Sequence, residues 1–574
     1  MTEMVKMVKR WATPIGPDVT RRDGVDVCVI GSGAGGAPAA LALARAGYRV
    51  VVLEKGPAYD QRDFVNDEVG IARRDFFRPS PADDPHIQIQ ADGRAHRSVV
   101  GWTAVCVGGG TVHMSGFSYR LHPEDLKLRS VLGEDSATTL IDWPIAFEEL
   151  EPYYEKAEIE LGVSGVAGKN PFERQRRPFP LPPLPESGMA RLVEQACEKL
   201  GYHAYPTPRA VVSRPYQGRP PCQPNSFCGS FGCPVGAKSS TLAALLPKAV
   251  ATGRCQIRPM CMVHTIDVDR RGHARRVGYF DSEGRGRSIS ARVVVVACSP
   301  VETARLLLHS GSKAHRAGLC NENGWVGSSF MLAGFGGATA DFSFSDPRLA
   351  KIDWNEPWIH RSVQDFYFID RGKSSQRKGG TLDYMFPHPG PIYLAERMAK
   401  FGRKKALWGQ ELKDRLRETV RDGRQVEFEV TTDPRPLRSS RVTLDPRVKD
   451  RWGLPVARMD IKQHRQDVET NKYIVDRGVE ILEAMGGKNA RVLRYGSFIE
   501  YVLAGTCRFG KSAEQAALDR DCRSWSCPNL FVCDGSFMPT MGGTPNTLTI
   551  VANSFRVGDR IAALGRSFGL ERAT

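Results

Sequence analysis

Val25-Asp26-Val27-Cys28-Val29-Ile30-Gly31-Ser32-Gly33-Ala34-Gly35-Gly36 is the stretch of sequence that decides the fold. Its first half is a short apolar run that ends in glycine, which is typical of a buried parallel strand. Residues 37–46 are rich in alanine and leucine, with Pro38 in the first turn, and predict a helix that stops at Gly47. Residues 48–53 predict the next strand. Together these elements form a βαβ unit.

The glycines between the first strand and the helix predict a site for the diphosphate of a dinucleotide. Gly31 permits the tight turn, Gly33 lets the backbone approach a pyrophosphate, and Gly36 allows close packing of helix on strand. The helix N-terminus then presents free N–H groups and its positive dipole end to the phosphates. Glu54 follows the second strand, where a carboxylate can accept hydrogen bonds from the adenosine ribose. These residues alone do not separate NAD from FAD.

Two later stretches have the pattern of strands from the same parallel sheet. Residues 293–297 predict a buried strand followed by a helix over 302–309. Residues 530–533 predict another strand, and residues 548–564 a closing helix. Because pieces of one sheet occur at the start, middle and end of the chain, the segments between them must be inserted.

The segment 341–495 has a different pattern. Alternating stretches at 426–430 and 441–444 predict antiparallel strands, and residues 468–485 predict a helix. We therefore expect an α/β protein in which a discontinuous, Rossmann-like nucleotide-binding domain carries an inserted α+β substrate domain with an antiparallel sheet. The expected domains are 24–340 (with cap or loop insertions at 60–105 and 150–230), 341–495 and 496–574.

Composition narrows the class of protein. With 41% hydrophobic and 25% charged residues the chain has ordinary globular composition. No apolar run is long enough for a transmembrane segment, and the first 23 residues lack the apolar core of a secretory signal, so the default compartment is the cytoplasm. The basic residues behind the net charge of +16 are spread along the chain without a nucleic-acid motif, so no nucleic-acid partner is expected. The densest basic patch, 400–405, is either a solvated helix face or a docking surface for an acidic partner protein.

Several further segments resemble the glucose–methanol–choline (GMC) oxidoreductase family. They are Val107-Gly-Gly-Gly-Thr-Val-His113, residues 293–300, Asn529-Leu-Phe-Val-Cys-Asp-Gly-Ser536 and Gly542-Gly-Thr-Pro-Asn-Thr-Leu-Thr-Ile550. They occur in the family's order and spacing over nearly the whole chain. Within the family, the likeness is greatest to bacterial flavoproteins of the gluconate dehydrogenase and pyranose oxidase kind. The resemblance implies FAD as the cofactor.

The resemblance also implies roles for individual residues. His113 matches a histidine that some members join covalently to the flavin 8α-methyl group; in the alternative interpretation it only packs against the dimethylbenzene edge. Asp534 and Gly535 are expected near the ribityl–phosphate chain, and Val263 near the adenine. The remaining residues expected to contact FAD are Gly109, Gly110, Thr111 and Thr547 to Thr549.

The family's catalytic pattern is altered in this chain. Members oxidise an alcohol by removing the hydroxyl proton while the carbinol hydride goes to flavin N5, and a histidine four residues before the threonine of a Gly-Thr-Cys-Arg segment normally serves as base. Val502 occupies that position here, and valine cannot take a proton. The last histidine of the chain is His464, so no shift of register restores one. The following Asn-Pro pair is reversed to Pro545-Asn546, which changes the local backbone.

Three interpretations remain open. In the first, the chain oxidises a CH–OH group of a small polyol, sugar or secondary-metabolite alcohol, with Asn546 near the substrate oxygen and another residue as base. Candidates for that base are Tyr501, Glu500, His360 and His388. In the second, the flavin performs a dehydrogenation that needs no base at this place. In the third, the chain is a flavin-binding subunit whose main role is to bind a partner, such as an electron-acceptor protein.

A cluster of cysteines lies on a Gly/Pro-rich loop. The chain has 14 cysteines and no signal peptide, which argues for thiols or metal ligands rather than a disulfide framework. Cys222, Cys228 and Cys233 resemble the ligand run of an iron–sulfur cluster. The alternatives are a packed loop with free or disulfide-bonded cysteines, and a zinc site, for which a fourth ligand would be needed.

Overall fold

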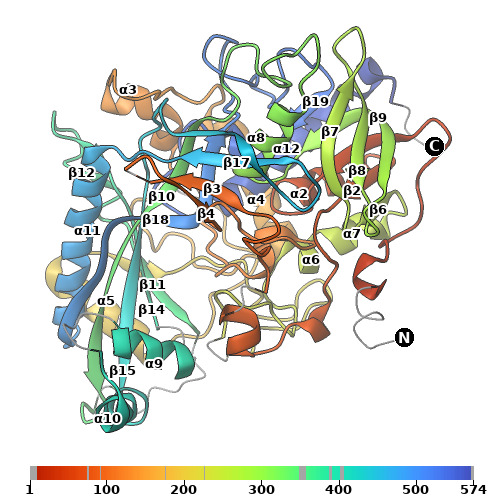
Figure 1. Cartoon of the computed structure of the whole chain (residues 1–574). Helices are drawn as coiled ribbons and strands as arrows, with labels where there is room; N and C mark the ends of the chain where they lie inside the picture. Colours follow the sequence, from red (N-terminus) through yellow and green to blue (C-terminus); the bar gives the residue numbers. More distant parts are fainter. Residues whose placement is uncertain are drawn as a thin grey trace.

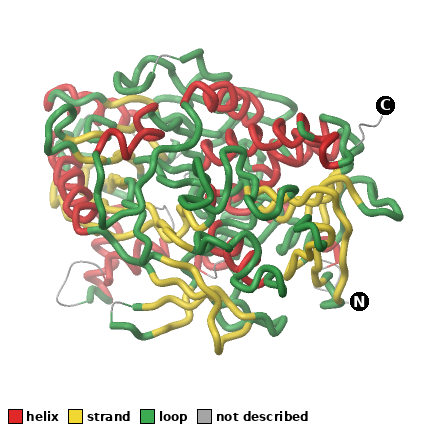
Figure 2. The backbone as a smooth tube through the Cα atoms, turned by 90° about the horizontal axis from the view of Figure 1, so that it is seen from above, coloured by secondary structure: helices red, strands yellow, loops and turns green. Residues whose placement is uncertain are grey.

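The structure is a computed structural model that describes residues 9–73, 76–90, 92–174, 176–224, 227–347, 349, 357–386, 391–400 and 406–570. Its strands form two large sheets, which appear as separate groups with loops between them (Figures 1 and 2). A short hairpin is formed by β12 (Phe368–Ile369) and β13 (Arg377–Lys378). No helix in the described ranges is long and apolar enough to cross a membrane.

The first sheet contains the predicted parallel strands. Its order is β6 (Cys255–Arg258), β2 (Val50–Leu53), β1 (Val25–Ile30), β9 (Gly286–Val296), β8 (Ala274–Phe280) and β7 (Met262–Val268), with β19 (Leu530–Val532) beside β9. β1 pairs in parallel with β2 and β9, and every residue of β1 is buried. β9 begins earlier than predicted, because its first half pairs antiparallel with β8. The strands predicted at 25–30, 48–53, 293–297 and 530–533 are thus confirmed as members of one sheet.

The second sheet is mostly antiparallel. Its order is β4 (Ala95–Ser98), β3 (His86–Ile89), β17 (Pro455–Asp460), β16 (Arg441–Lys449), β10 (Ser328–Ser343), β15 (Gly423–Thr432), β14 (Gly380–Met385), β11 (Ile359–Val363) and β5 (Ala204–Pro206), with β18 (Lys488–Thr506) beside β10. The predicted strands at 426–430 and 441–444 lie within β15 and β16. β18 runs without a break across residues 495 and 496, where we expected one domain to end and the next to begin.

Helices cover both sheets. They are α2 (Gly36–Arg45), α3 (Leu128–Leu132), α4 (Phe147–Leu161), α5 (Gly188–Leu200), α6 (Thr241–Ala244), α7 (Leu246–Ala251), α8 (Pro300–His309), α9 (Pro391–Lys400), α10 (Gly409–Val420), α11 (Arg465–Ala484) and α12 (Thr547–Ala563). In Figure 1, α11 lies along the outer side of the second sheet. Gly478 makes that packing possible, because a Cβ there would lie 2.4 Å from the Phe428 ring of β15. The face of β15 that carries Phe428 is therefore buried beneath α11, and its other face is turned away from that helix.

Candidate cofactor and active site

A cavity of about 530 Å³ is lined by both sheets. Its walls include the turn after β1, the loop at 109–117, the ends of β9 and β19 and the start of α12. Side chains of β14, β15 and β18 complete it from the second sheet. The cavity therefore lies at the carboxyl ends of the parallel strands, where open α/β sheets bind their ligands.

The glycine turn after β1 forms one wall. Gly31 has a φ of +97°, and a Cβ there would lie 2.3 Å from the Ala297 carbonyl oxygen. At Gly36 a Cβ would lie 1.9 Å from the Gly31 carbonyl oxygen. At both positions a side chain would clash with the backbone of the protein itself, whether or not a ligand is bound. Gly33 differs, since the atom nearest to an added Cβ is the Gly109 Cα at 3.7 Å. A side chain at Gly33 would therefore meet the second glycine loop at an ordinary contact distance, without a clash.

Glu54 lies at the end of β2, where it was predicted. Its Oε2 accepts hydrogen bonds from the Ser32 amide (3.1 Å) and hydroxyl (2.6 Å), and its Oε1 accepts one from the Gly56 amide (2.9 Å). Burial raises the pKa of Glu54, and these donors act in the opposite direction. The Ser32 hydroxyl also accepts from the Gly108 amide at 2.9 Å, so one side chain ties the two glycine loops together. Sequence reasoning missed Ser32, because its role depends on a contact 76 residues away.

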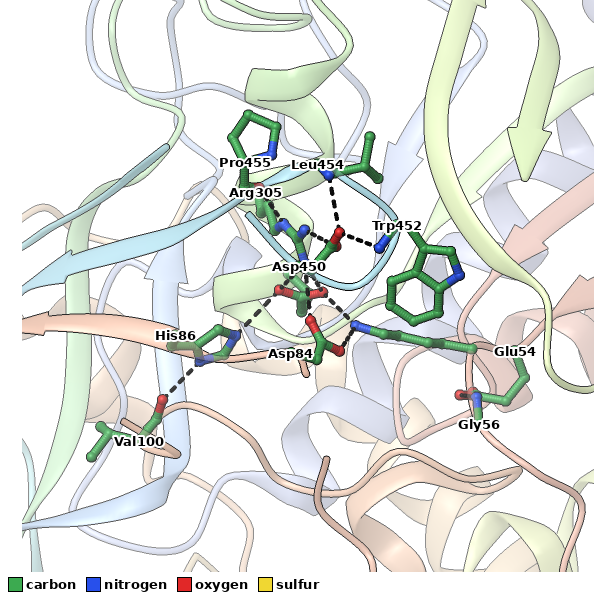
Figure 3. A network of polar contacts seen from close by, with 12 residues as sticks. Glu54, Gly56, Asp84, His86, Val100, Arg305, Asp450, Trp452, Leu454 and Pro455 are labelled. Atoms are coloured by element: carbon green, nitrogen blue, oxygen red, sulfur yellow. Dashed lines mark hydrogen bonds and ion pairs between the residues drawn. The ribbon is translucent and has the colours of Figure 1, made fainter. Parts of the chain in front are cut away.

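A network of buried charges adjoins the Glu54 end of the cavity (Figure 3). The Lys55 ammonium lies 2.5 Å from Asp84 and 3.3 Å from Glu302. His86 Nε2 lies 3.2 Å from Glu302, and the Arg305 guanidinium lies 3.3 Å from the same carboxylate. Burial alone would raise the pKa of Glu302, but Lys55, Arg305 and His86 outweigh it and hold that pKa well below its usual range.

Arg305 extends this network to the second sheet. Its guanidinium pairs with Asp450 and donates to the Pro455 carbonyl at 2.9 Å. Asp450 lies in the turn between β16 and β17, and it also accepts from the amides of Trp452 (2.9 Å) and Leu454 (3.0 Å). Figure 3 shows these contacts converging on Asp450 from α8 and from the turn. The network therefore fixes α8, and with it one end of the cavity, to the edge of the second sheet.

Asp534 follows β19 and lines the cavity. Its Oδ2 accepts from the Ser299 amide at 3.1 Å and from the Thr303 hydroxyl, and its Oδ1 accepts from the Ser536 amide at 2.8 Å. Burial raises the pKa of Asp534 despite these donors. The Gly35 position lies against it, because a Cβ there would be 2.8 Å from the Asp534 Cα. Asp534 thus joins the start of α8 to the segment after β19, directly beside the first glycine turn.

Ser299 is a polar residue of the cavity wall that sequence reasoning did not find. It adopts a φ of +78° and a ψ of 150°, a region that residues other than glycine rarely enter. Among the described residues, its buried hydroxyl oxygen has no hydrogen-bond partner. Buried hydroxyl groups normally have a hydrogen-bond partner. The unpaired Ser299 hydroxyl, beside Asp534 and Gly35, therefore fits a site where a polar ligand supplies that partner. FAD meets this requirement, since its ribityl and phosphate groups offer both donors and acceptors.

Val263 and the second glycine loop line the same cavity. Val263 lies two residues after Cys261, whose amide donates to the Glu54 carbonyl at 2.8 Å, so Val263 lines the cavity near Glu54. Gly109 and Gly110 belong to a 3₁₀ turn, Gly109–Val112, and both line the cavity. The Thr111 hydroxyl donates to the Gly108 carbonyl at 2.6 Å and therefore shapes the turn from within.

His113 lies in the cavity wall after this turn. Its Nε2 lies 2.7 Å from the Thr103 carbonyl oxygen, and its ring stacks on Phe77 with centroids 5.2 Å apart. Burial lowers the pKa of His113 to about 4, the Thr103 carbonyl opposes this shift, and the Lys238 and Arg78 charges add to it. The imidazole is therefore neutral near pH 7, with its proton on Nε2 and a lone pair on Nδ1.

Asn546 lines the cavity at the start of α12. Its Nδ2 donates to the Leu503 carbonyl at 2.9 Å and lies 3.6 Å from the Met538 Sδ. No side chain caps α12, so its first amides, beginning at Thr547, remain available at the cavity. The side-chain N–H of Asn546 thus holds the start of α12 against β18. Its Oδ1 remains as a hydrogen-bond acceptor.

The segment of β18 around Val502, where the family resemblance leads us to expect a histidine, lies next to Asn546. Val502, Leu503 and Tyr501 of β18 line the cavity. Tyr501 is 51% exposed, and Arg78 lies 5.9 Å from its ring centre. Glu500 is exposed and does not belong to the cavity wall. Of the two neighbouring candidates for a base, the structure therefore brings only Tyr501 to the site.

Two other expectations fall outside what the structure describes. His388 and most of the basic patch at 400–405 lie outside the described residues, and so do the side chains of His360 and Lys400.

Two of the three clustered cysteines accept hydrogen bonds from neighbouring residues. The Cys228 Sγ accepts from the Arg209 guanidinium at 3.3 Å, and the Cys233 Sγ accepts from the Lys238 amide at 3.5 Å. Burial raises the pKa of Cys228, but Lys238 and Arg209 outweigh it and lower that pKa overall. Cys222 completes the loop as a free thiol. No group of three or more His, Cys, Asp or Glu side chains in the described ranges is arranged to hold a metal ion.

Comparison with known families agrees with this geometry. GMC oxidoreductase family models match residues 93–332 and 436–554, and an FAD binding domain model matches residues 26–61. The 2-methyl-1,2-propanediol dehydrogenase of Mycolicibacterium austroafricanum is 31% identical over 95% of this chain and 96% of its own. The fructose dehydrogenase large subunit of Gluconobacter japonicus is 27% identical over 93% of this chain and 97% of its own.

Among solved structures, pyridoxine 4-oxidase from Mesorbium loti has the same fold. It superposes with a TM-score of 0.63 at 17% identity, over 93% of this chain and 99% of that one. The fold, the matched models and the first of these relatives together lead to one conclusion. The chain belongs to the GMC oxidoreductase family and is an FAD-dependent oxidoreductase that acts on CH–OH groups.

Proposed function

We propose that this enzyme oxidises the CH–OH group of a small polyol, sugar or secondary-metabolite alcohol. The observation that carries the proposal is the continuity of the cavity, which joins two facing glycine loops to a wall made by Asn546, Tyr501 and Val502. One relative is named for a small diol and another for a sugar, which supports substrates of this size. Bound FAD supplies the acceptor for the hydride.

Different residues along the cavity bind different parts of FAD and the substrate. The amides of the two glycine loops and of α2 bind the diphosphate, Glu54 accepts from the ribose, and the free amides of α12 face the flavin ring. Near the ring, the Asn546 Oδ1 accepts a hydrogen bond from the substrate hydroxyl. The cavity-lining residues that we assign to the FAD site are Gly31, Gly33, Glu54, Gly109, Gly110, Thr111, His113, Val263, Asp534, Gly535 and Thr547. Gly36 does not line the cavity and supports the site by allowing α2 to pack closely on the turn after β1.

Anaerobic mixing of the FAD-loaded protein with a panel of alcohols tests this function. Diols, sugars and hydroxyl-bearing secondary metabolites are mixed with the protein, and the flavin absorption is followed. We expect at least one of them to bleach the flavin. A flavin that sodium dithionite bleaches, but none of the alcohols does, would contradict the proposal and favour the partner-binding interpretation.

His113 is proposed to hold the flavin without a covalent bond. Its Nε2 faces the Thr103 carbonyl and its ring stacks on Phe77, so packing already orients the imidazole. We expect denaturation in acid to release all the yellow colour, and the intact mass to equal that of the chain. A mass increase equal to FAD, lost in His113→Ala, would instead show a bond from the imidazole to the flavin.

We further propose that a partner protein reoxidises the flavin. The support is the relative named as the large subunit of fructose dehydrogenase, which marks it as one part of an assembly.

A further inference from the structure

Glu429 lies in the wall of the cavity, on β15 of the second sheet. It pairs with Gly337 of β10 on one side and with Asp383 of β14 on the other. Because side chains alternate along a strand, Glu429 points away from the face on which Phe428 packs beneath α11. It therefore presents its carboxyl group to the same cavity as Tyr501.

The acids around Glu429 raise its proton affinity. Burial raises the pKa of Glu429 to about 8, and the charges of Asp383 on β14 and Glu427 on β15 add to this. Asp383 is itself held by hydroxyl groups, since its Oδ1 accepts from Ser362 at 2.5 Å and from Tyr119. Among the described residues, no group donates a comparable hydrogen bond to Glu429. The lone pairs of Glu429 are therefore open to a ligand in the cavity.

The groups on β18 and the loop at Arg78 complete the surroundings of Glu429. Although 51% of Tyr501 is exposed, partial desolvation and the charge of the neighbouring Glu429 raise the pKa of its phenol, and the charges of Arg78 and Arg494 oppose this shift. The phenol thus stays protonated near neutral pH, so it can donate a hydrogen bond but cannot take a proton. Val502, at the place of the family's histidine, has no titratable group. Glu429 is left as a cavity-facing group that changes its charge near physiological pH.

We propose that Glu429 is the catalytic base of this enzyme and takes the hydroxyl proton of the bound alcohol at a carboxylate oxygen. This role rests on the proposed function. The O–H bond breaks, its proton passes to Glu429 and its electron pair forms the C=O bond. The carbinol C–H bond breaks with its hydrogen and electron pair leaving as hydride to bound FAD, so the alcohol loses two electrons and the flavin gains them. A half-buried carboxyl with a raised pKa suits this task, because a base works best when its pKa lies near the working pH.

The rate of anaerobic flavin bleaching by an alcohol that reduces the parent enzyme is the first test. Glu429→Gln keeps the shape but removes the base, so we expect a rate about 10²–10⁴-fold lower. The parent rate is expected to rise with pH through about 8, and the Glu429→Gln rate to stay flat. Glu429→Asp keeps a carboxyl group and should retain a slower but pH-dependent reaction. Glu500→Gln is the matched control, because Glu500 is an exposed acid outside the cavity wall, and it should react like the parent.

The melting temperature of the FAD-loaded enzyme against pH gives a readout that does not depend on turnover. An acid whose pKa rises on folding, from about 4.3 in the unfolded chain, stabilises the fold below that value and loses this contribution as the pH rises through its folded pKa. The parent should therefore lose stability between about pH 4 and about pH 8 relative to Glu429→Gln.

The possible outcomes separate the two proposals. Equal bleaching rates and equal pH profiles for the parent and Glu429→Gln would overturn the role of Glu429 while leaving the proposed function intact. A parent that no alcohol bleaches would contradict the proposed function, and the role of Glu429 would fall with it. A slow Glu429→Gln reaction that keeps the parent's pH profile would also overturn the role, since the base would then be another group.

Discussion

Gly33→Ala is expected to leave the fold intact and to remove most of the affinity for FAD. The protein has room for the added methyl group, because the nearest atom to a Cβ at this position is 3.7 Å away. The added methyl group would lie against the second glycine loop, at the cavity wall along which we propose that the diphosphate passes. Losing one or two charge-assisted hydrogen bonds, at about 1.5–3 kcal/mol each, makes the complex roughly 100-fold weaker. Quenching of flavin fluorescence on titration of the apoprotein measures the dissociation constant.

Two other glycines provide the controls. Gly286→Ala adds a methyl group where nothing lies within 4 Å and the residue is outside the cavity wall, so both melting temperature and FAD affinity should match the parent. Gly36→Ala places a Cβ 1.9 Å from the Gly31 carbonyl oxygen and should destabilise the chain even without FAD. A Gly33→Ala protein that melts like the parent and binds FAD as tightly would show that the diphosphate takes another path.

Arg305→Met is expected to lower the free energy of unfolding by about 3–5 kcal/mol, the usual cost of breaking a buried ion pair from one side. Arg305 is 4% exposed, and its loss leaves the buried carboxylates of Asp450 and Glu302 without their shared cation. The matched control is Arg285→Met, since Arg285 pairs with Asp281 at the surface with 55% of its side chain exposed. That change should leave the free energy of unfolding nearly unchanged, because exposed ion pairs contribute little. Urea unfolding followed by tryptophan fluorescence measures both.

The effect of Arg305→Met should depend on pH. The pKa of Glu302 is depressed in the fold, so its contribution is fully present above its unfolded pKa of about 4.3 and is lost as the pH falls through the lower folded value. Without Arg305, the pKa of Glu302 in the folded state is less depressed. The variant therefore loses less stability than the parent as the pH falls. The difference between variant and parent should therefore shrink below about pH 4. A difference that is small at pH 7, or that grows in acid, would show that the network does not hold the fold together.

The first sheet and its glycine turn were predictable because their signals are local. The run Val25–Ile30, the spacing of Gly31, Gly33 and Gly36, and the place of Glu54 are all read within one βαβ unit. The helix predicted at 468–485 was also confirmed, as α11. Its amphipathic pattern survives because one side of it packs on a sheet.

The charged network and the cavity face of β15 were not predictable in the same way. Asp84, Glu302 and Asp450 meet only in the folded chain, and no pattern in the sequence links them. Glu427 and Glu429 alternate with buried apolar residues in a predicted strand, a pattern that usually marks a solvent-facing side. Here that side faces the cavity instead. The two acidic residues on this strand were a signal in the sequence. They indicate a site only once the structure shows that their side of the sheet faces the cavity.

FAD bound along the two glycine loops is the claim on which the other proposals depend. The most direct measurement is the absorption spectrum of the purified protein after incubation with FAD and gel filtration. The structure predicts flavin bands that elute with the parent chain and are absent from Gly33→Ala treated in the same way. A folded parent protein that elutes colourless after incubation with excess FAD would contradict the claim.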